Sequence, residues 1–127
     1  MEEKQRIVLI LRGISGSGKT FFSHDVMKLY NSKSITSVSA DNYMIDFRGN
    51  YFFNPEKLPY AHNQCLKHYI NCILSKDFDI IFVDNTNISV EEISPYLRIA
   101  NAYSYKVYIV NFICEFEEAH KRCVHNI

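Results

Sequence analysis

The segment "RIVLILRGISGSGKT", residues 6–20, decides the fold. Its first half is a continuous apolar run that ends at Gly13, which is typical of a β-strand buried on both faces. From Gly13 to Thr20 the segment fits the pattern G-x-x-x-x-G-K-S/T in full. Glycines in such a loop let backbone N–H groups approach an anion, and the N-terminus of the following helix adds positive potential. The segment therefore predicts a strand, a phosphate-binding loop and a helix in succession.

The polar positions of this loop have predicted roles in holding a nucleotide. Lys19 is expected to bridge the outer phosphates, and the Thr20 hydroxyl is expected to ligate Mg²⁺. Because a buried strand precedes the loop and a helix follows it, we interpret it as a nucleotide site rather than an ordinary Gly/Ser turn. The predicted nucleotide-binding residues are Gly13, Ser15, Gly16, Ser17, Gly18, Lys19 and Thr20.

Strands and helices are predicted to alternate along the rest of the chain. Short apolar or β-branched runs at 35–40, 78–84 and 105–113 indicate three further strands. One helix is expected from Thr20, with Leu29 and Tyr30 on its apolar side, and a second over about 58–73. A third is expected to start at Pro95, a residue favoured at the first helical position. This alternation predicts an α/β fold with a short parallel sheet of about four strands and helices on both faces.

Length and composition narrow the functional classes. The 127 residues suit a single domain, and 47% apolar residues supply a core. Fourteen basic residues balance fourteen acidic ones, which argues against coating long nucleic acid by bulk charge. No long apolar segment suggests a signal peptide or a membrane span, so a cytoplasmic protein is expected. No zinc is expected, because Cys114, His120, Cys123 and His125 match no common zinc site.

Two acidic residues follow the other predicted strands at the edge that carries the phosphate loop. Asp41 comes after strand 35–40, and Asp84 ends strand 78–84. In an open parallel sheet, ligands bind beyond the carboxyl ends of the strands. Asp84 is placed like the acid that holds Mg²⁺ through water or Thr20, whereas Asp41 would aim an acceptor hydroxyl at the γ-phosphate. Either residue could instead cap a turn at the end of its strand.

Further polar side chains are candidates for the same site. Asn85, Thr86 and Asn87 offer amide and hydroxyl contacts to an acceptor, although a polar turn has the same composition. A final helical stripe is predicted from Phe116, Ala119, Cys123 and Ile127. Arg122 on this segment could neutralise charge on a transferred phosphoryl group, although a solvated arginine is the commoner case.

The loop over residues 41–55 is rich in aromatic side chains and reads as an ordered loop or a small hairpin. Tyr43, Tyr51, Phe52 and Phe53 could stack on a base, and Tyr43 is a candidate substrate residue. A small aromatic core under the loop is the more frequent arrangement.

The same motifs recur in the same order in a family of small P-loop kinases. The matching stretches are "LRGISGSGKT", "SADNYM", "NYFFNPEKLPYAHNQCL", "FVDNTN", "PYLRIANAYSYKV" and "RCVHNI", which together span nearly all of residues 6–127. The chain thus resembles bacterial and phage AAA-family ATP-binding proteins. It is also similar to the kinase domain of phage polynucleotide 5′-kinase and, more distantly, to zeta toxins. The resemblance implies a P-loop NTPase or kinase-like three-layer α/β/α fold that uses ATP and Mg²⁺.

The resemblance also implies roles for single residues. It assigns the acceptor-activating carboxylate to Asp41 and a lid arginine to Arg122, and "VHNI" makes His125 a lid candidate that contacts the acceptor. The polynucleotide-kinase pattern has a phosphate-binding Arg three residues after the Asp, where this chain has Met44. Family members usually continue past this point, so the lid segment, about 114–127, is expected to be short.

The leading hypothesis is an ATP- and Mg²⁺-dependent kinase that moves a γ-phosphate to a hydroxyl group. Asp41, Lys19 and Arg122 are its predicted catalytic residues. The acceptor would be a 5′-OH nucleic-acid end, a nucleotide or a small metabolite such as a nucleotide sugar. A non-catalytic ATP-binding module and a simple ATPase are the alternatives. GTPase-type guanine selection is not predicted, because no Asn-Lys-x-Asp motif follows the loop.

Overall fold

The structure is a computed structural model that describes residues 5–14, 16–31 and 33–113. Its sheet has the order β2-β3-β1-β4, and all neighbouring strands are parallel. The strands are β1 (Ile7–Arg12), β2 (Ile35–Val38), β3 (Ile80–Asp84) and β4 (Lys106–Asn111). The helices are α1 (Lys19–Leu29), α2 (Leu58–Ser75) and α3 (Val90–Ala102), with 3-10 turns η1 (Ala40–Tyr43) and η2 (Pro55–Lys57). The predicted α/β fold with a short four-stranded parallel sheet is confirmed.

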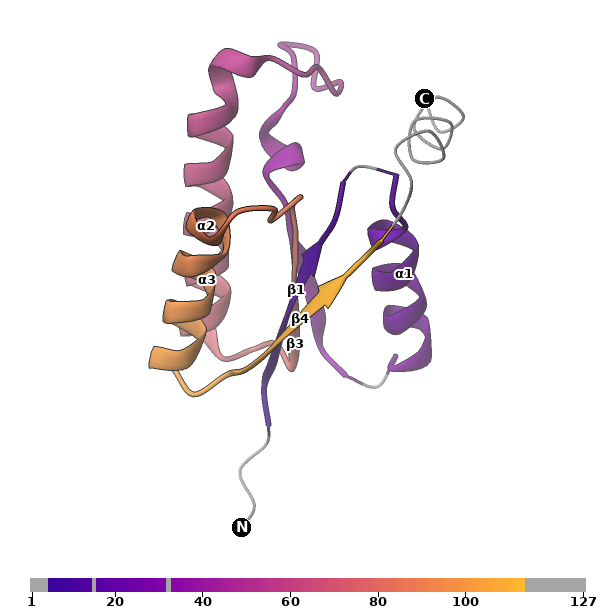
Figure 1. The fold of residues 1–127 in the computed structure, drawn as a ribbon, viewed down its shortest axis with the longest axis vertical. Coiled ribbons are helices and arrows are strands. Elements are labelled where there is room, and N and C mark those ends of the chain that lie inside the picture. Colours follow the sequence, from indigo (N-terminus) through magenta and orange to yellow (C-terminus); the bar gives the residue numbers. More distant parts are fainter. Residues whose placement is uncertain (1–4, 15, 32, 114–127) are drawn as a thin grey trace.

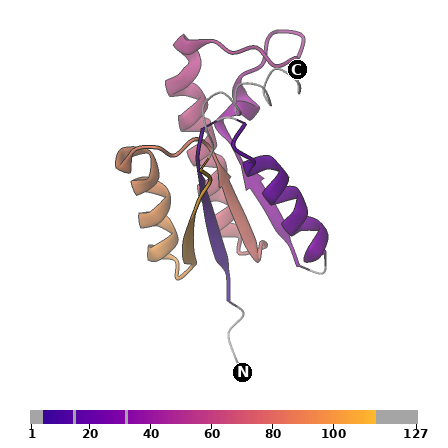
Figure 2. The same ribbon diagram turned by 45° about the vertical axis from the view of Figure 1, so that its right-hand side comes forward.

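Helices cover both faces of the sheet, with α1 on one side and α2 and α3 on the other (Figures 1 and 2). The side chains of β1 alternate between the two faces because successive residues of a strand point to opposite sides. Val8 and Ile10 belong to the core under α2 and α3, whereas Leu11 packs with Phe82 and Phe22 on the α1 side. The rings of Phe22 and Phe82 pack edge to face, with their centroids 6.2 Å apart. Burial on both faces explains the continuous apolar run of β1.

The strand register brings three loops to one edge. Leu11 of β1 pairs with Asp84 of β3, and Val38 of β2 pairs with Val83. All three strands run in the same direction, so the loop after β1, the residues after β3 and η1 after β2 leave from the same edge. This arrangement is the one expected for a ligand site in a parallel sheet.

The first helix is buried over a shorter stretch than its sequence predicts. Phe22 and Val26 are partly buried against the sheet, but Leu29 is 77% exposed and Tyr30 is 50% exposed. The apolar stripe of α1 therefore packs against the core as far as Met27, and not beyond it. Within the described ranges, no helix combines the length and the hydropathy that crossing a membrane requires.

The prediction that the third helix starts at Pro95 is wrong. Helix α3 begins five residues earlier, at Val90, and its N-cap is Ser89, whose hydroxyl accepts a hydrogen bond from the Glu92 N–H at 3.2 Å. Pro95 lies inside the helix and has no N–H to complete the helical ladder. The cap and the burial of Tyr96 and Ala100 against the sheet outweigh that missing bond.

We expect Ser89→Ala to destabilise the protein by about 1 kcal/mol, because it removes the acceptor for an otherwise unpaired helix N–H. Urea unfolding followed by circular dichroism measures this as a lower midpoint with an unchanged slope. Ser34→Ala, at an exposed position before β2, is the control. Equal midpoints for Ser89→Ala and the wild type would show that the cap does not set the start of α3.

Residues 45–53, here called the aromatic hairpin, form a short ordered turn. Ile45 and Tyr51 make an antiparallel bridge. The Asp46 carboxylate accepts hydrogen bonds from the backbone N–H groups of Arg48 and Asn50, both at 2.9 Å. The turn also contains a glycine, residue 49, with φ of 84°, a value that favours glycine. These contacts make the hairpin a defined structure rather than a loose loop.

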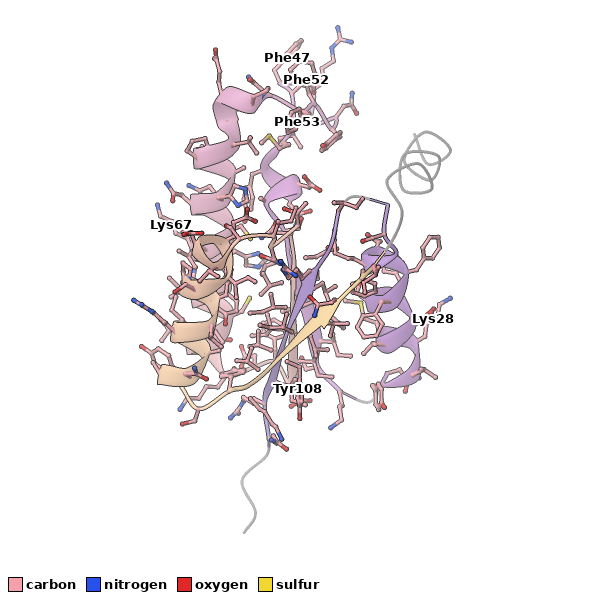
Figure 3. All side chains as sticks on the ribbon, in the orientation of Figure 1. Lys28, Phe47, Phe52, Phe53, Lys67 and Tyr108 are labelled. Carbon is pink, nitrogen blue, oxygen red and sulfur yellow. The ribbon has the colours of Figure 1, made fainter. Side chains whose placement is uncertain are left out.

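The predicted small aromatic core under this loop is absent from the described structure. Phe47 is 93% exposed, and Tyr51, Phe52 and Phe53 are each more than half exposed. Phe47, Phe52 and Phe53 gather at the end of the molecule beyond the carboxyl ends of the strands (Figure 3). The hairpin projects past the sheet, so its aromatic rings have no layer to pack against.

Candidate functional site

The phosphate loop has the backbone geometry that its glycines predict. Gly16 has φ of 84° and Gly18 has φ of 107°, a left-handed region that L side chains rarely adopt. A Cβ added at Gly13 would lie 2.7 Å from the Ser17 hydroxyl oxygen, so the loop closes tightly there. Ser15 lies outside the described residues.

The polar side chains of the loop fit a phosphate group. Lys19 is buried, and its ammonium donates hydrogen bonds to the carbonyls of Gly13 and of Ile14, the latter at 3.1 Å. The Ser17 hydroxyl is buried and finds no partner among the described residues. A buried unpaired donor is costly, and an anion oxygen would accept a hydrogen bond from this hydroxyl. Thr20 is exposed and lines the pocket beside the loop.

A pocket of about 470 Å³ joins the loop to the other two strand ends. Asp41 of η1 and Asp84 of β3 both line it, together with Lys19 and Thr20. The remaining lining residues are Gly16, Gly18, Phe21, Ala40, Met44, Tyr51, Phe53, Leu58, His62, Asn85 and Thr86. The structure thus brings four of the predicted nucleotide-binding residues, Gly16, Gly18, Lys19 and Thr20, to one cavity with Asp41 and Asp84.

The two carboxylates are close enough to influence each other. Burial raises the pKa of Asp84, Lys19 and His24 lower it, and the nearby charge of Asp41 raises it. Carboxylate and hydroxyl oxygens are the ligands that Mg²⁺ prefers, and Asp84 and Thr20 present both kinds in this pocket. The residues present therefore fit a magnesium ion beside a phosphate.

We expect Asp84→Asn to raise the melting temperature of the Mg²⁺-free protein at pH 7 by roughly 2–5 °C. The folded-state pKa of Asp84 lies above the ordinary value of 3.8, so the ionised carboxylate costs stability. That cost appears as the pH rises through the raised pKa, and the advantage of the variant should shrink as the pH is lowered towards 4.

Scanning calorimetry between pH 4 and pH 7, with the exposed Asp25→Asn on α1 as control, measures the difference. A lower melting temperature for Asp84→Asn at pH 7 would instead mean that attraction to Lys19 exceeds the cost of burial.

Asn85 and Thr86 reach the pocket but also have structural partners. The Asn85 side-chain oxygen accepts a hydrogen bond at 2.8 Å from the Ala40 N–H, the residue before Asp41. The Thr86 carbonyl accepts a hydrogen bond at 2.9 Å from the Gly13 N–H, at the start of the phosphate loop. The segment after β3 therefore positions both the phosphate loop and η1, a role that its sequence did not indicate.

The structure does not bring Tyr43 and Asn87 to the pocket wall. Tyr43 packs against the core under α2. Asn87 is 1% exposed, and its amide nitrogen donates a 2.7 Å hydrogen bond to the Leu11 carbonyl at the end of β1. Its φ of 53° is a conformation that asparagine tolerates better than most residues. Burial in this turn gives Asn87 a structural role in place of the predicted contact with an acceptor.

Other pocket residues carried no predicted function. Leu58 and His62 lie four residues apart on α2 and both line the pocket. Their i, i+4 spacing shows that they share a helix face, but it does not show that this face meets the phosphate loop. The predicted lid residues Arg122 and His125 lie outside the described residues.

Fold and loop together define a kinase-like P-loop domain. The chain belongs to the family described as "AAA domain", whose model matches residues 8–125. Over 101 residues it is 30% identical to human NEDD4-binding protein 2, an alignment that takes in 80% of this chain and 6% of that protein.

Two solved structures show the same fold. A chain of the Pnkp1/Rnl/Hen1 complex aligns with a TM-score of 0.74 and 22% identity, covering 97% of this chain and 40% of that one. The Mycobacterium tuberculosis APS kinase CysC, in complex with AMPPNP and APS, aligns with a TM-score of 0.68 and 15% identity over 94% of this chain and 69% of that one. At these identities the likeness establishes the fold. The chain spans 6% of the human relative's length and 40% of the first structure's.

Proposed function

We propose that the protein is an ATP-dependent phosphotransferase that moves the γ-phosphoryl group to a hydroxyl acceptor. The observation that carries the proposal is the shared pocket, in which Lys19 and Thr20 of the phosphate loop lie with Asp84 and Asp41. A site that only held a nucleotide and its metal would need Lys19, Thr20 and Asp84, but not Asp41. Asp41 is an additional exposed carboxylate at the place where an acceptor would approach the terminal phosphate.

The chemistry assigned to this chain is one in-line displacement. The acceptor oxygen forms a bond to the γ-phosphorus, and the bond from that phosphorus to the bridging oxygen breaks, which releases ADP. Asp41 accepts a hydrogen bond from the acceptor hydroxyl and takes up its proton as the new bond forms. Lys19 and the loop N–H groups stabilise the negative charge on the phosphate oxygens. A weak base suffices, because the loose transition state needs positioning more than early proton removal.

Asp84 and Thr20 are the residues that would hold Mg²⁺. When bound, the ion supplies positive charge to the phosphate oxygens of the donor. The likeness in fold to an APS kinase bound to AMPPNP supports a nucleotide donor and the kinase class.

The proposal is tested by incubating the protein with γ-labelled ATP, Mg²⁺ and a panel of hydroxyl acceptors. The panel contains 5′-OH oligonucleotides, nucleosides, nucleotides, nucleotide sugars and simple polyols. Label transferred to one acceptor class supports the proposal. Release of free phosphate at a rate independent of every acceptor would identify an ATPase, and nucleotide binding without turnover would identify a binding module.

A further inference from the structure

The pocket has two unlike walls. The phosphate loop and the start of α1 form the polar wall. Opposite them lie the residue that follows η1, two residues of the aromatic hairpin and two residues of α2. These five residues are here called the acceptor wall: Met44, Tyr51, Phe53, Leu58 and His62. Figure 1 shows α1 and α2 on opposite sides of the strand ends. The presence of Asp41 raises the pKa of Tyr51, after the larger effect of burial, so the acceptor wall begins next to the proposed base.

Hydrogen bonds hold the backbone that carries the aromatic rings of this wall, and the rings themselves are accessible. Tyr51 is 63% exposed and Phe53 is 53% exposed. The Phe52 N–H, between them, donates a 2.9 Å hydrogen bond to the Met44 carbonyl, and the Asp46 carboxylate fixes the turn. Exposing large apolar rings on an ordered element has a cost in free energy. Accessible aromatic rings on an ordered backbone, in a pocket that also holds Lys19 and two carboxylates, indicate a site for a planar ligand group.

The charge of the acceptor wall limits the chemical class of ligand that it can bind. Its residues include no lysine or arginine, and its buried floor is formed in part by Met44, which is 1% exposed. Among the described residues of this wall, a phosphate attached near the reacting hydroxyl would find no fixed cation. His62 supplies a ring nitrogen that can make one directional hydrogen bond. Stacking surfaces with a single polar anchor suit the face and edge of an uncharged heteroaromatic ring.

We propose that the acceptor wall binds a nucleobase of the acceptor, with Tyr51 and Phe53 stacking on the base and His62 hydrogen-bonding to its edge. This inference rests on the proposed phosphotransferase function and names the acceptor class as nucleosides, whose sugar carries no phosphate.

In-line transfer assigns this wall to the acceptor rather than to the donor. The attacking and leaving oxygens lie on opposite sides of the transferred phosphorus. With the donor phosphates on the loop and Lys19, the acceptor has to approach from the side of Asp41, where the wall lies. The base of the donor must then lie elsewhere.

The test uses the fluorescent nucleoside 2-aminopurine riboside, whose emission is quenched when its base stacks. The chain has no tryptophan, so the probe signal is read without that background. We expect saturable quenching by the wild type and a dissociation constant raised about tenfold or more in Tyr51→Ala and Phe53→Ala. Tyr51→Phe should restore binding because it keeps the ring. Phe47→Ala is the matched control, since Phe47 is on the same hairpin but does not line the pocket.

Three results would overturn the proposal, provided that circular dichroism shows folded variants. The first is no quenching of the probe by the wild type, and the second is that Phe47→Ala weakens probe binding as much as Tyr51→Ala and Phe53→Ala do. The third is competitive displacement of the probe by a non-hydrolysable ATP analogue, which would place the base of the donor at the acceptor wall. If the protein transfers label to simple polyols and Phe53→Ala does so at the same rate, the proposed nucleobase site is refuted and the proposed kinase function still stands. If the wild type binds the probe, Phe53→Ala does not, and the wild type transfers label to no acceptor, the nucleobase site stands and the kinase function is refuted.

Discussion

Asp41→Asn is expected to lower the rate of phosphoryl transfer about a hundredfold or more while leaving ATP affinity within about twofold. Asparagine keeps the size of the side chain but cannot take up the proton of the acceptor. The fold of η1 should persist, because Asp41 takes part in it through its backbone. Its N–H donates to the Ser39 hydroxyl at 3.2 Å, and its carbonyl accepts from the Met44 N–H at 3.1 Å. The loss should therefore be one of chemistry and not of structure.

Single-turnover transfer of label from γ-labelled ATP measures the rate, and titration with a fluorescent ATP analogue measures the affinity. Asp25→Asn, which removes an exposed carboxylate from α1, is the matched control and should transfer at the wild-type rate. A variant at Asp41 that retains full transfer would remove this residue from the mechanism. Loss of ATP affinity together with rate would assign Asp41 to the nucleotide or its metal instead.

Lys19→Ala is expected to weaken ATP binding about a hundredfold or more and to abolish measurable turnover. Its ammonium is the positive side chain within the phosphate loop, and its contacts with the carbonyls of Gly13 and Ile14 hold it there. A phosphate would be the stronger partner, because the hydrogen bonds would then join opposite charges.

The control for this prediction is Lys28→Ala on the outer surface of α1 (Figure 3), which removes one positive charge at an exposed position. Isothermal calorimetry with a non-hydrolysable ATP analogue measures the affinity, and thermal unfolding checks that the variant keeps its fold. Wild-type affinity in a folded Lys19→Ala protein would mean that the loop does not hold the donor phosphates.

Much of the site could be predicted because local sequence controls local backbone. The apolar run of β1, the glycines at 16 and 18 and the following amphipathic stretch each restrict φ and ψ or burial within a few residues. Parallel strands then place Asp41 and Asp84 at the same edge as the loop. These steps need no knowledge of which side chains meet.

The start of α3 shows where local rules compete. Pro95 favours the first turn of a helix, and Ser89 with Glu92 forms a cap six residues earlier. Both signals are present in the sequence. Packing of Tyr96 and Ala100 against the sheet favours the longer helix and decides between them.

The sequence by itself determined the α/β order, the phosphate loop and the edge of the sheet at which the acidic residues lie, because these follow from backbone preferences and strand direction. Only the tertiary structure decided that Asn87 is buried at the end of β1, that Tyr51 and Phe53 line the pocket, and that His62 joins them. Each of those outcomes depends on segments distant in the sequence that supply or withhold a packing surface, which no local pattern encodes.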